Sequence, residues 1–237
     1  MSDRERFLAR VRRALGRAAG AGPGHQDSAL GAVGGSYRAA LPPRADHPGD
    51  DPSAWRSRFV AELEAVGGSA EAVARAALGT AAAAYAARLK ISRVVAWDPA
   101  LLPEDAGRLL ADALAALSAA GLDVRTWPAA AADAEMGVVV AEAAIAASGT
   151  VMISSGPGKG RSVSLLPEHL LVLVPAPALR PTLGEALADV AGMTRSGRIP
   201  HNVTLITGPS KSADIEQQMI RGVHGPRTVH ALVLHDG

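Results

Sequence analysis

Apolar residues along this chain follow two alternating patterns, a helical spacing and short unbroken runs. A helical spacing leads up to the Gly-Gly pair at 67–68, in Trp55, Phe59, Leu63 and Val66. This spacing predicts one face of a helix that ends at the glycines. Similar patterns predict helices at about 78–89, 103–120 and 181–190, and a helical turn or two at 141–147.

Short apolar runs between these segments are typical of buried strands. They lie at 94–97, 122–127, 136–140, 150–153, 170–174, 203–206 and 228–234. Helices that alternate with such strands predict an α/β fold with a mostly parallel sheet covered on both faces. Active sites in open sheets of this kind gather at the carboxyl ends of the strands.

The N-terminal part of the chain has a different character. Residues 1–17 are expected to form an amphipathic helical arm, with Phe7, Leu8, Val11 and Leu15 on its apolar face. Six arginines against two carboxylates give this arm a charge of +4. It is interpreted either as a docking helix for a partner or as an arm folded on its own domain. Residues 18–52, rich in Gly, Pro and Ala, are expected to be a flexible linker, and 53–237 to be the α/β domain.

Composition excludes several classes of function. The net charge of the 237 residues is +1 and aromatic residues make up only 3%, which argues against a nucleic-acid-binding protein. The absence of cysteine excludes a disulfide, a thiolate nucleophile and a cysteine-ligated iron–sulfur cluster in this chain. The scattered histidines predict no bound metal. No apolar run is long enough to span a bilayer and no leader peptide is recognised, so a cytoplasmic protein is expected.

Two glycine-rich loops contain two of the three lysines. The first is 154–162 with Lys159, and the second is 206–216 with Lys211. In the second, a strand and a Gly-Pro turn are expected to lead into a helix capped by Ser210 or Ser212, with Asp214 and Glu216 in its first turn. Such a helix N-terminus, with a lysine beside it, can bind an anion. The alternative is a well-capped helix with no ligand.

Candidates for acid–base chemistry are few. His224 lies in a loop where an imidazole could act as acid, base or ligand, although a histidine bonded to the backbone is commoner. Glu142 and Glu168 are the carboxylates nearest the glycine-rich loops. Either could be a base, and a solvated surface glutamate is the alternative for both.

Four ordered segments resemble the LUD-domain family of bacterial lactate utilization proteins. They are 146–150 (AASGT), 160–167 (GRSVSLLP), 206–216 (ITGPSKSADIE) and 222–226 (GVHGP). The resemblance covers the chain from about Trp55 to Leu234. It implies a three-layer α/β/α domain similar to the group of ribose-phosphate isomerase, CoA-transferase and formyltetrahydrofolate cyclo-ligase. The family often has an acidic residue where this chain has Ala147, so a carboxylate at that position is missing here.

The resemblance also implies a function. The chain is expected to be a non-redox subunit that supports the oxidation of L-lactate to pyruvate beside iron–sulfur partner proteins, carrying no cofactor itself. A homo-oligomer is left open. The alternative is a stand-alone enzyme similar to CoA-transferases or the cyclo-ligase, using Glu142 or Glu168. An organic acid or a nucleotide phosphate is expected in a cleft between the two glycine-rich loops. The residues expected to bind it are Ser148, Gly149, Thr150, Gly158, Lys159, Arg161, Ser162, Thr207, Gly208, Pro209, Ser210, Lys211, Asp214, Glu216, His224 and Arg227.

Overall fold

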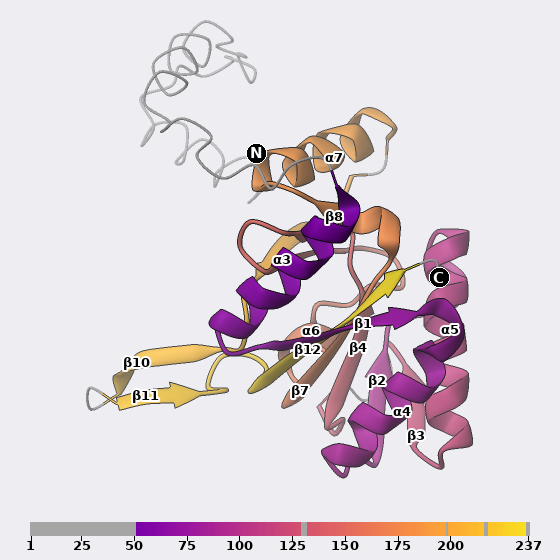
Figure 1. Cartoon of the computed structure of the whole chain (residues 1–237). Helices are drawn as coiled ribbons and strands as arrows, with labels where there is room; N and C mark the ends of the chain where they lie inside the picture. The colour runs from indigo at the N-terminus through magenta and orange to yellow at the C-terminus, as the bar shows by residue number, and fades with distance from the viewer. Residues whose placement is uncertain (1–50, 129–131, 198, 216–217, 236–237) are drawn as a thin grey trace, which may run out of the picture. The chain divides into compact units, whose positions relative to one another are not determined.

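A computed structural model describes residues 51–128, 132–197, 199–215 and 218–235, and no side chain is described at 212–221 (Figure 1). The predicted arm at 1–17 and nearly all of the predicted linker at 18–52 lie outside these residues. The first described element is helix α3, Pro52–Ala65, which Asp51 caps by accepting a bond from the Ser53 N–H at 2.9 Å. This helix confirms the one predicted from its apolar spacing, and it buries Phe59 and Leu63.

The centre of the domain is a six-stranded sheet in which all neighbouring strands are parallel. In spatial order its strands are β1 (Ser69–Ala74), β12 (Thr228–His235), β7 (His169–Val174), β4 (Met136–Val140), β2 (Arg93–Ala96) and β3 (Asp123–Thr126). The middle strands β4 and β7 are buried almost throughout, because they are apolar on both faces. The predicted parallel α/β fold is therefore confirmed.

Helices cover both faces of this sheet. Helices α4 (Leu78–Arg88) and α5 (Glu104–Ala119) pack side by side on one face (Figure 1). The short helix α6 (Ser162–Leu165) packs on β4. One-turn 3-10 segments at Arg75–Ala77, Pro99–Leu101 (η2) and Ala176–Ala178 complete the connections. Among the described residues, no helix is both long and apolar enough to cross a membrane.

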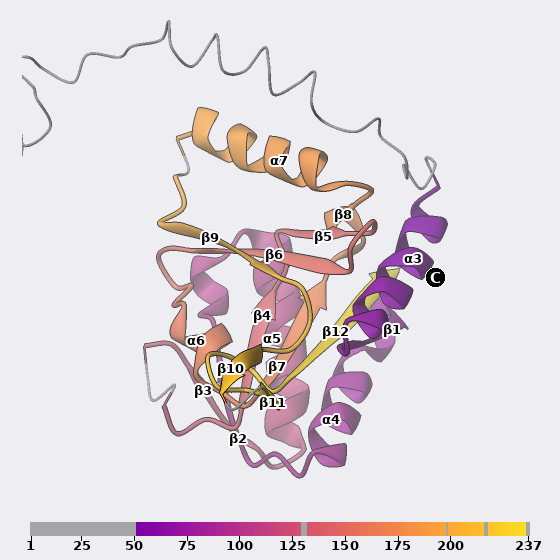
Figure 2. The same ribbon diagram turned by 90° about the vertical axis from the view of Figure 1, so that its left-hand side faces the viewer.

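A second, four-stranded sheet was not predicted. Its order is β8 (Leu179–Arg180), β5 (Ala143–Ile145), β6 (Thr150–Ser155) and β9 (Asn202–Ile206). Helix α7 (Leu183–Arg195) lies across it, with Ala186 packed against the sheet residues Ala143, Ile145 and Met152 (Figure 2). The helical turn predicted at 141–147 is thus wrong. Although this alanine-rich segment favours a helix, it is held as a strand by β6 on one side and β8 on the other.

The helix predicted after Gly208-Pro209 is also wrong. Residues Lys211–Ile215 form β10, which pairs antiparallel with β11 (Gln218–Arg221) as a separate hairpin (Figure 1). Gly208 has a φ of +77°, and Ser210 is bonded through its backbone to Pro226 and Gly222. These bonds fix the direction of the chain after the turn, so a strand starts where capping residues had suggested a helix.

The small sheet lies beyond the carboxyl ends of β4 and β7 (Figure 2). Strand β4 ends at Val140 and β5 begins at Ala143, so only Ala141 and Glu142 separate these two strands, which belong to different sheets. Glu142 is thereby held where the parallel strands end, which is the edge at which ligand sites of such sheets are found.

Candidate functional site

Side chains from three separate segments meet at the carboxyl edge of the large sheet. Glu142 follows β4, Trp97 follows β2, and Ser154 comes from β6 of the small sheet. The pairing of Ala96 with Val138 and of Ala143 with Met152 brings these segments together. Lys159 enters from the loop after β6, which folds back over the edge.

Glu142, Ser154 and Lys159 form a closed polar triangle. Lys159 Nζ lies 2.5 Å from Glu142 Oε1 and 2.6 Å from Ser154 Oγ, and Ser154 Oγ donates to the same carboxylate oxygen at 2.7 Å. The side chains of Lys159 and Glu142 are only 17% and 20% exposed. Hydrogen bonds that involve charged groups are stronger than neutral ones, and partial burial reduces the screening by solvent. The triangle is therefore a rigid and strongly polar feature of the site.

The loop that carries Lys159 is fixed by backbone bonds. Gly156 and Lys159 exchange two of them, at 3.2 and 3.0 Å, and the Gly158 carbonyl accepts from Asp98 N at 3.0 Å. The Gly160 carbonyl accepts from the Trp97 indole Nε1 at 3.2 Å. A β-carbon at Gly160 would lie 2.3 Å from the indole nitrogen of Trp127, so only glycine allows this approach. The position of the ammonium group is thus set by the glycine-rich sequence.

The triangle leaves one acceptor and one donor without a partner among the described residues. Both bonds to Glu142 end on Oε1, so its Oε2 accepts none, and Lys159 uses two of the three N–H groups of an ammonium. No fully buried side-chain atom of the described residues lacks a partner, so Oε2 is reached by solvent. Glu142 Oε2 can therefore accept a proton or a hydrogen bond from a ligand, and the third N–H of Lys159 can donate a hydrogen bond to the ligand.

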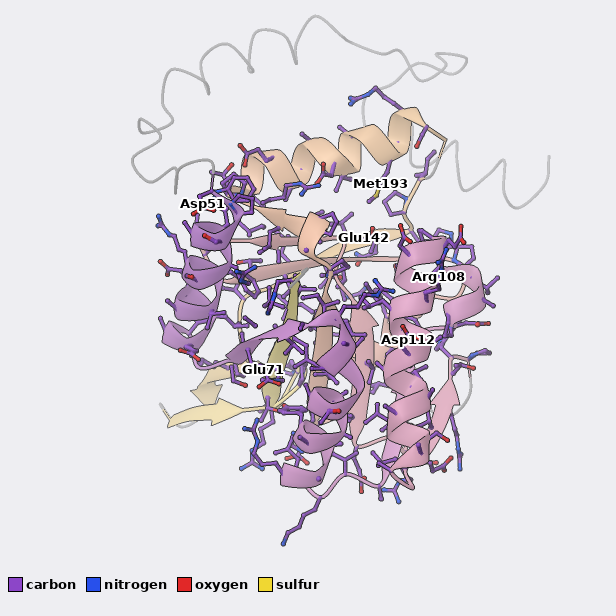
Figure 3. All side chains as sticks on the ribbon, turned by 45° about the vertical axis from the view of Figure 1, so that its right-hand side comes forward. Asp51, Glu71, Arg108, Asp112, Glu142 and Met193 are labelled. Atoms are coloured by element: carbon purple, nitrogen blue, oxygen red, sulfur yellow. The ribbon has the colours of Figure 1, made fainter. Side chains whose placement is uncertain are left out.

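A cavity of about 630 Å³ lies against the triangle. Glu142, Ser154 and Lys159 form part of its wall, and His201 adds an exposed imidazole. The rest of the wall is mostly apolar: Leu101, Leu102, Pro103, Pro157, Met193, Ile199 and Pro200. Figure 3 shows Met193 on α7 and Glu142 below that helix, at the end of the parallel sheet. An apolar pocket with a few convergent polar groups is the usual form of a small-molecule site.

Of the predicted site residues, Glu142, Gly158 and Lys159 meet here. The Ser148-Gly149-Thr150 motif lies at the other end of β6, where the Thr150 hydroxyl is 2.8 Å from both the Ser148 and the Thr207 hydroxyls. Gly149 has a φ of +58°, and a β-carbon there would lie 2.2 Å from the Leu63 backbone nitrogen. This motif therefore joins the small sheet to α3.

The predicted cleft between the two glycine-rich loops is contradicted by the strand pairing. Strands β6 and β9 are antiparallel, with Val151 opposite Ile206 and Ser155 opposite Asn202. The loop of Lys159 follows one end of this pair, and the turn at Thr207, Gly208 and Pro209 follows the other. Lys211 Nζ donates instead to the Val66 carbonyl at 2.6 Å. The two lysines do not serve one site.

The remaining candidates lie near the amino ends of the strands. Glu168 precedes β7 and pairs with Arg227, which precedes β12, at 3.1 Å between exposed side chains. With His224 they line a separate cavity of about 610 Å³. Arg161 is exposed before α6, and Ser162 begins that helix. Asp214 belongs to β10 with no described side chain, and Glu216 lies outside the described residues. Neither Glu168 nor His224 reaches the carboxyl-edge triangle.

Ser154, Trp97 and His201 were missed as site residues by sequence reasoning. Ser154 stands at the start of the first glycine-rich loop, but it is 5% exposed at the end of a buried strand, where its hydroxyl completes the triangle. Trp97 follows an apolar run, and its ring lies 5.7 Å from Lys159 Nζ. Within the described residues, no group of three or more His, Asp or Glu side chains could hold a metal ion.

Comparison with known proteins relates this chain to one family and to several curated relatives. Residues 57–234 match the LUD domain. The curated relatives named lactate utilization protein C include three that illustrate the similarity. The one from Shouchella clausii is 40% identical over 103 residues, 44% of this chain and 45% of its own length. The one from Halalkalibacterium halodurans is 41% identical over 104 residues, 44% of this chain and 45% of its own length. The one from Bacillus licheniformis is 40% identical over 125 residues, 49% of this chain and 52% of its own length. The matched stretch spans about half the length of these relatives.

A solved structure has the same fold. The crystal structure of a DUF162 family protein from Deinococcus radiodurans superposes with a TM-score of 0.55, covering 78% of this chain and 99% of that protein. The two sequences are 23% identical, so this likeness concerns the fold alone.

Proposed function

The chain belongs to the LUD-domain family, and from this we propose that it acts in lactate utilization as a non-redox subunit, binding a small organic acid beside Glu142 and Lys159. The observation that carries the proposal is the 40% identity to proteins named lactate utilization protein C. In this proposal the oxidation of L-lactate to pyruvate takes place with partner proteins that hold iron–sulfur clusters. The chain has no cysteine to ligate such a cluster itself.

The polar triangle supports an organic acid as ligand. An ammonium group is a suitable point charge for a carboxylate, and Lys159 is held in place by Ser154 and Glu142 before any ligand arrives. Because Glu142 already balances the charge of Lys159, the pair does not attract anions in general. It favours a ligand that offers a carboxylate to Lys159 and a hydrogen-bond donor to Glu142.

Growth and capture experiments test the role in lactate utilization. Cells that lack the gene should fail to grow on L-lactate as carbon source, and the wild-type chain should restore growth. A Lys159→Met or Glu142→Gln chain should restore it poorly, whereas Lys211→Met should restore it fully. A tagged chain from lactate-grown cells should retain iron–sulfur proteins. Normal growth of the deletion strain on lactate would refute the role.

The alternative, a stand-alone enzyme, predicts a different result. A CoA-transferase would use a carboxylate at the substrate, and Glu142 at the carboxyl edge has a suitable position. Turnover of an acyl-CoA, or of ATP with a folate, by the purified chain alone and its loss in Glu142→Gln would favour this alternative over the subunit. We expect no such turnover.

A further inference from the structure

We infer that the cavity beside Glu142 and Lys159 selects 2-hydroxy acids whose side chain is apolar and larger than the methyl group of lactate, and binds them more tightly than the matching 2-oxo acids. The inference rests on the proposed role of this cavity as an organic-acid site. It adds the size of the ligand's side chain and the preference for the hydroxy over the oxo form.

Selection for a hydroxyl group follows from the unused atoms of the triangle. Glu142 Oε2 is an acceptor without a partner among the described residues, and it belongs to the carboxylate whose other oxygen is 2.5 Å from Lys159 Nζ. A 2-hydroxy acid carries a donor and a carboxylate on adjacent carbons. It can donate its O–H to Oε2 while its carboxylate accepts from the third N–H of Lys159.

A 2-oxo acid cannot make the first of these bonds. Its carbonyl oxygen is only an acceptor and would face the Glu142 carboxylate, which is an acceptor too. The bond is lost, and two oxygens that carry negative charge are brought together in a partly buried place. A site that is built to hydrogen-bond a hydroxyl group discriminates strongly against an analogue that lacks it.

The apolar wall indicates a larger side chain. Ile199 is 71% exposed and Leu101 is 58% exposed, so both rank among the most exposed large apolar residues in the described part of the chain. Both line this one cavity, and so does Met193 of α7. Exposed apolar groups that gather at a pocket mark a surface that is covered when a ligand binds.

The volume agrees with this interpretation. At about 30 Å³ per water molecule, a cavity of about 630 Å³ holds roughly twenty waters. An acid the size of lactate would displace only a few of them and would leave Ile199 and Leu101 wet. A branched side chain of four or five carbons, attached to the same acid group, would extend over both residues.

Calorimetric titration of the full chain tests the inference. The ligands are L-lactate, 2-hydroxy-4-methylpentanoate and 4-methyl-2-oxopentanoate. We expect 2-hydroxy-4-methylpentanoate to bind about tenfold more tightly than lactate, because it buries additional apolar carbons. We expect 4-methyl-2-oxopentanoate to bind at least about tenfold more weakly than its hydroxy form.

Two variants separate the two parts of the site. Ile199→Ser should reduce the preference for the larger acid several-fold, whereas Leu205→Ser, at another exposed apolar position that does not line the cavity, should leave that preference unchanged. Glu142→Gln, whose amide can still accept from Ser154, should reduce the discrimination between hydroxy and oxo acids. Melting curves establish that each variant is folded.

The outcomes distinguish this inference from the proposed function. Equal or tighter binding of lactate, equal binding of the oxo acid, or no binding of any 2-hydroxy acid would overturn the inference. Each of these results is compatible with a chain that still restores growth on lactate through its partners. Failure of the growth test, with the ligand preference intact, would overturn the role in lactate utilization and leave the ligand class standing.

Discussion

Lys159 and Lys211 show how differently two lysines in glycine-rich loops can be used. Lys159 is paired with Glu142 in a partly buried site. Lys211 is exposed, and its Nζ donates to the Val66 backbone carbonyl at 2.6 Å. Lys159→Met should abolish binding of 2-hydroxy acids. It should also lower the free energy of unfolding by about 1–3 kcal/mol, because Glu142 loses its charged partner in a place of low solvent access.

Lys211→Met is the matched control. Its bond is at the surface, so stability should change by no more than about 0.5–1 kcal/mol and ligand binding should be unchanged. Urea unfolding and calorimetric titration of both variants provide the measurements. Equal effects at the two positions would show that the lysines are not functionally distinct.

Buried His230 makes stability depend on pH. It lies on β12, accepts or donates a bond with Ser69 Oγ at 2.7 Å through Nδ1, and stacks on Tyr85 with ring centroids 4.3 Å apart. Burial, with a contribution from the charge of Arg88, lowers the pKa of His230 from 6.5 to about 4. The neutral imidazole is therefore the form that the folded protein holds, even though Glu71 lies 3.9 Å from Nε2.

The sign of the pH effect follows from these values. As the pH falls below about 6.5, the unfolded chain protonates this imidazole before the folded chain does, so the free energy of unfolding decreases until about pH 4. The loss attributable to His230 is about 3 kcal/mol. His169, whose pKa is also lowered by burial, adds to the loss in the same direction. Urea unfolding at pH 7.5, 6 and 5 should show a smaller dependence of stability on pH in His230→Gln than in the wild-type chain.

At the scale of elements, the contact between α6 and β4 depends on Gly137. A β-carbon at Gly137 would lie 1.9 Å from the Val163 carbonyl oxygen, a backbone atom that cannot turn away. Gly137→Ala should therefore displace α6 and lower the free energy of unfolding by about 2–4 kcal/mol. Gly184→Ala in the first turn of α7 meets nothing closer than 3.8 Å and should be neutral or slightly stabilising. Similar melting temperatures for the two variants would contradict this prediction.

The elements that could be predicted are those whose own sequence has a clear apolar pattern. Helix α5 and strands β4 and β7 have clear apolar patterns and were predicted close to their bounds. Strand β1 was missed because Ser69–Ala74 contains mostly small residues, and it is a strand only because β12 pairs with it. Strands β5 and β10 were predicted as helices for the same reason, since their partners along the sheets decide their conformation.

In the candidate site, too, single residues could be predicted from the sequence, whereas the contacts between them could not. Glu142 and Lys159 could be chosen individually, because a carboxylate after a buried strand and a lysine in a glycine loop are both visible in sequence. Their pairing with each other, and the separation of Lys159 from Lys211, depend on the register of β6 with β5 and β9. Register is a tertiary property that no local pattern in this chain revealed.

At the scale of the whole molecule, one hydrophobic core extends through the part of the chain that the structure describes. Its buried residues run from Phe59 in α3 to Leu234 in β12. The predicted arm, residues 1–17, lies outside the described residues. Its expected apolar face and its charge of +4 would suit a partner with an acidic, apolar surface.

Deleting residues 1–16 tests whether the arm serves a partner or its own domain. An isolated helix of this length is marginal, so its apolar face must be covered by something. If a partner covers it, the deletion should change the melting temperature by no more than about 3 °C, leave binding of 2-hydroxy acids intact and abolish capture of the partner proteins. A Leu8→Ser/Val11→Ser variant, which keeps the length and charge of the arm, should lose the partner equally. A large fall in melting temperature with partner capture intact would show that the arm packs on its own domain.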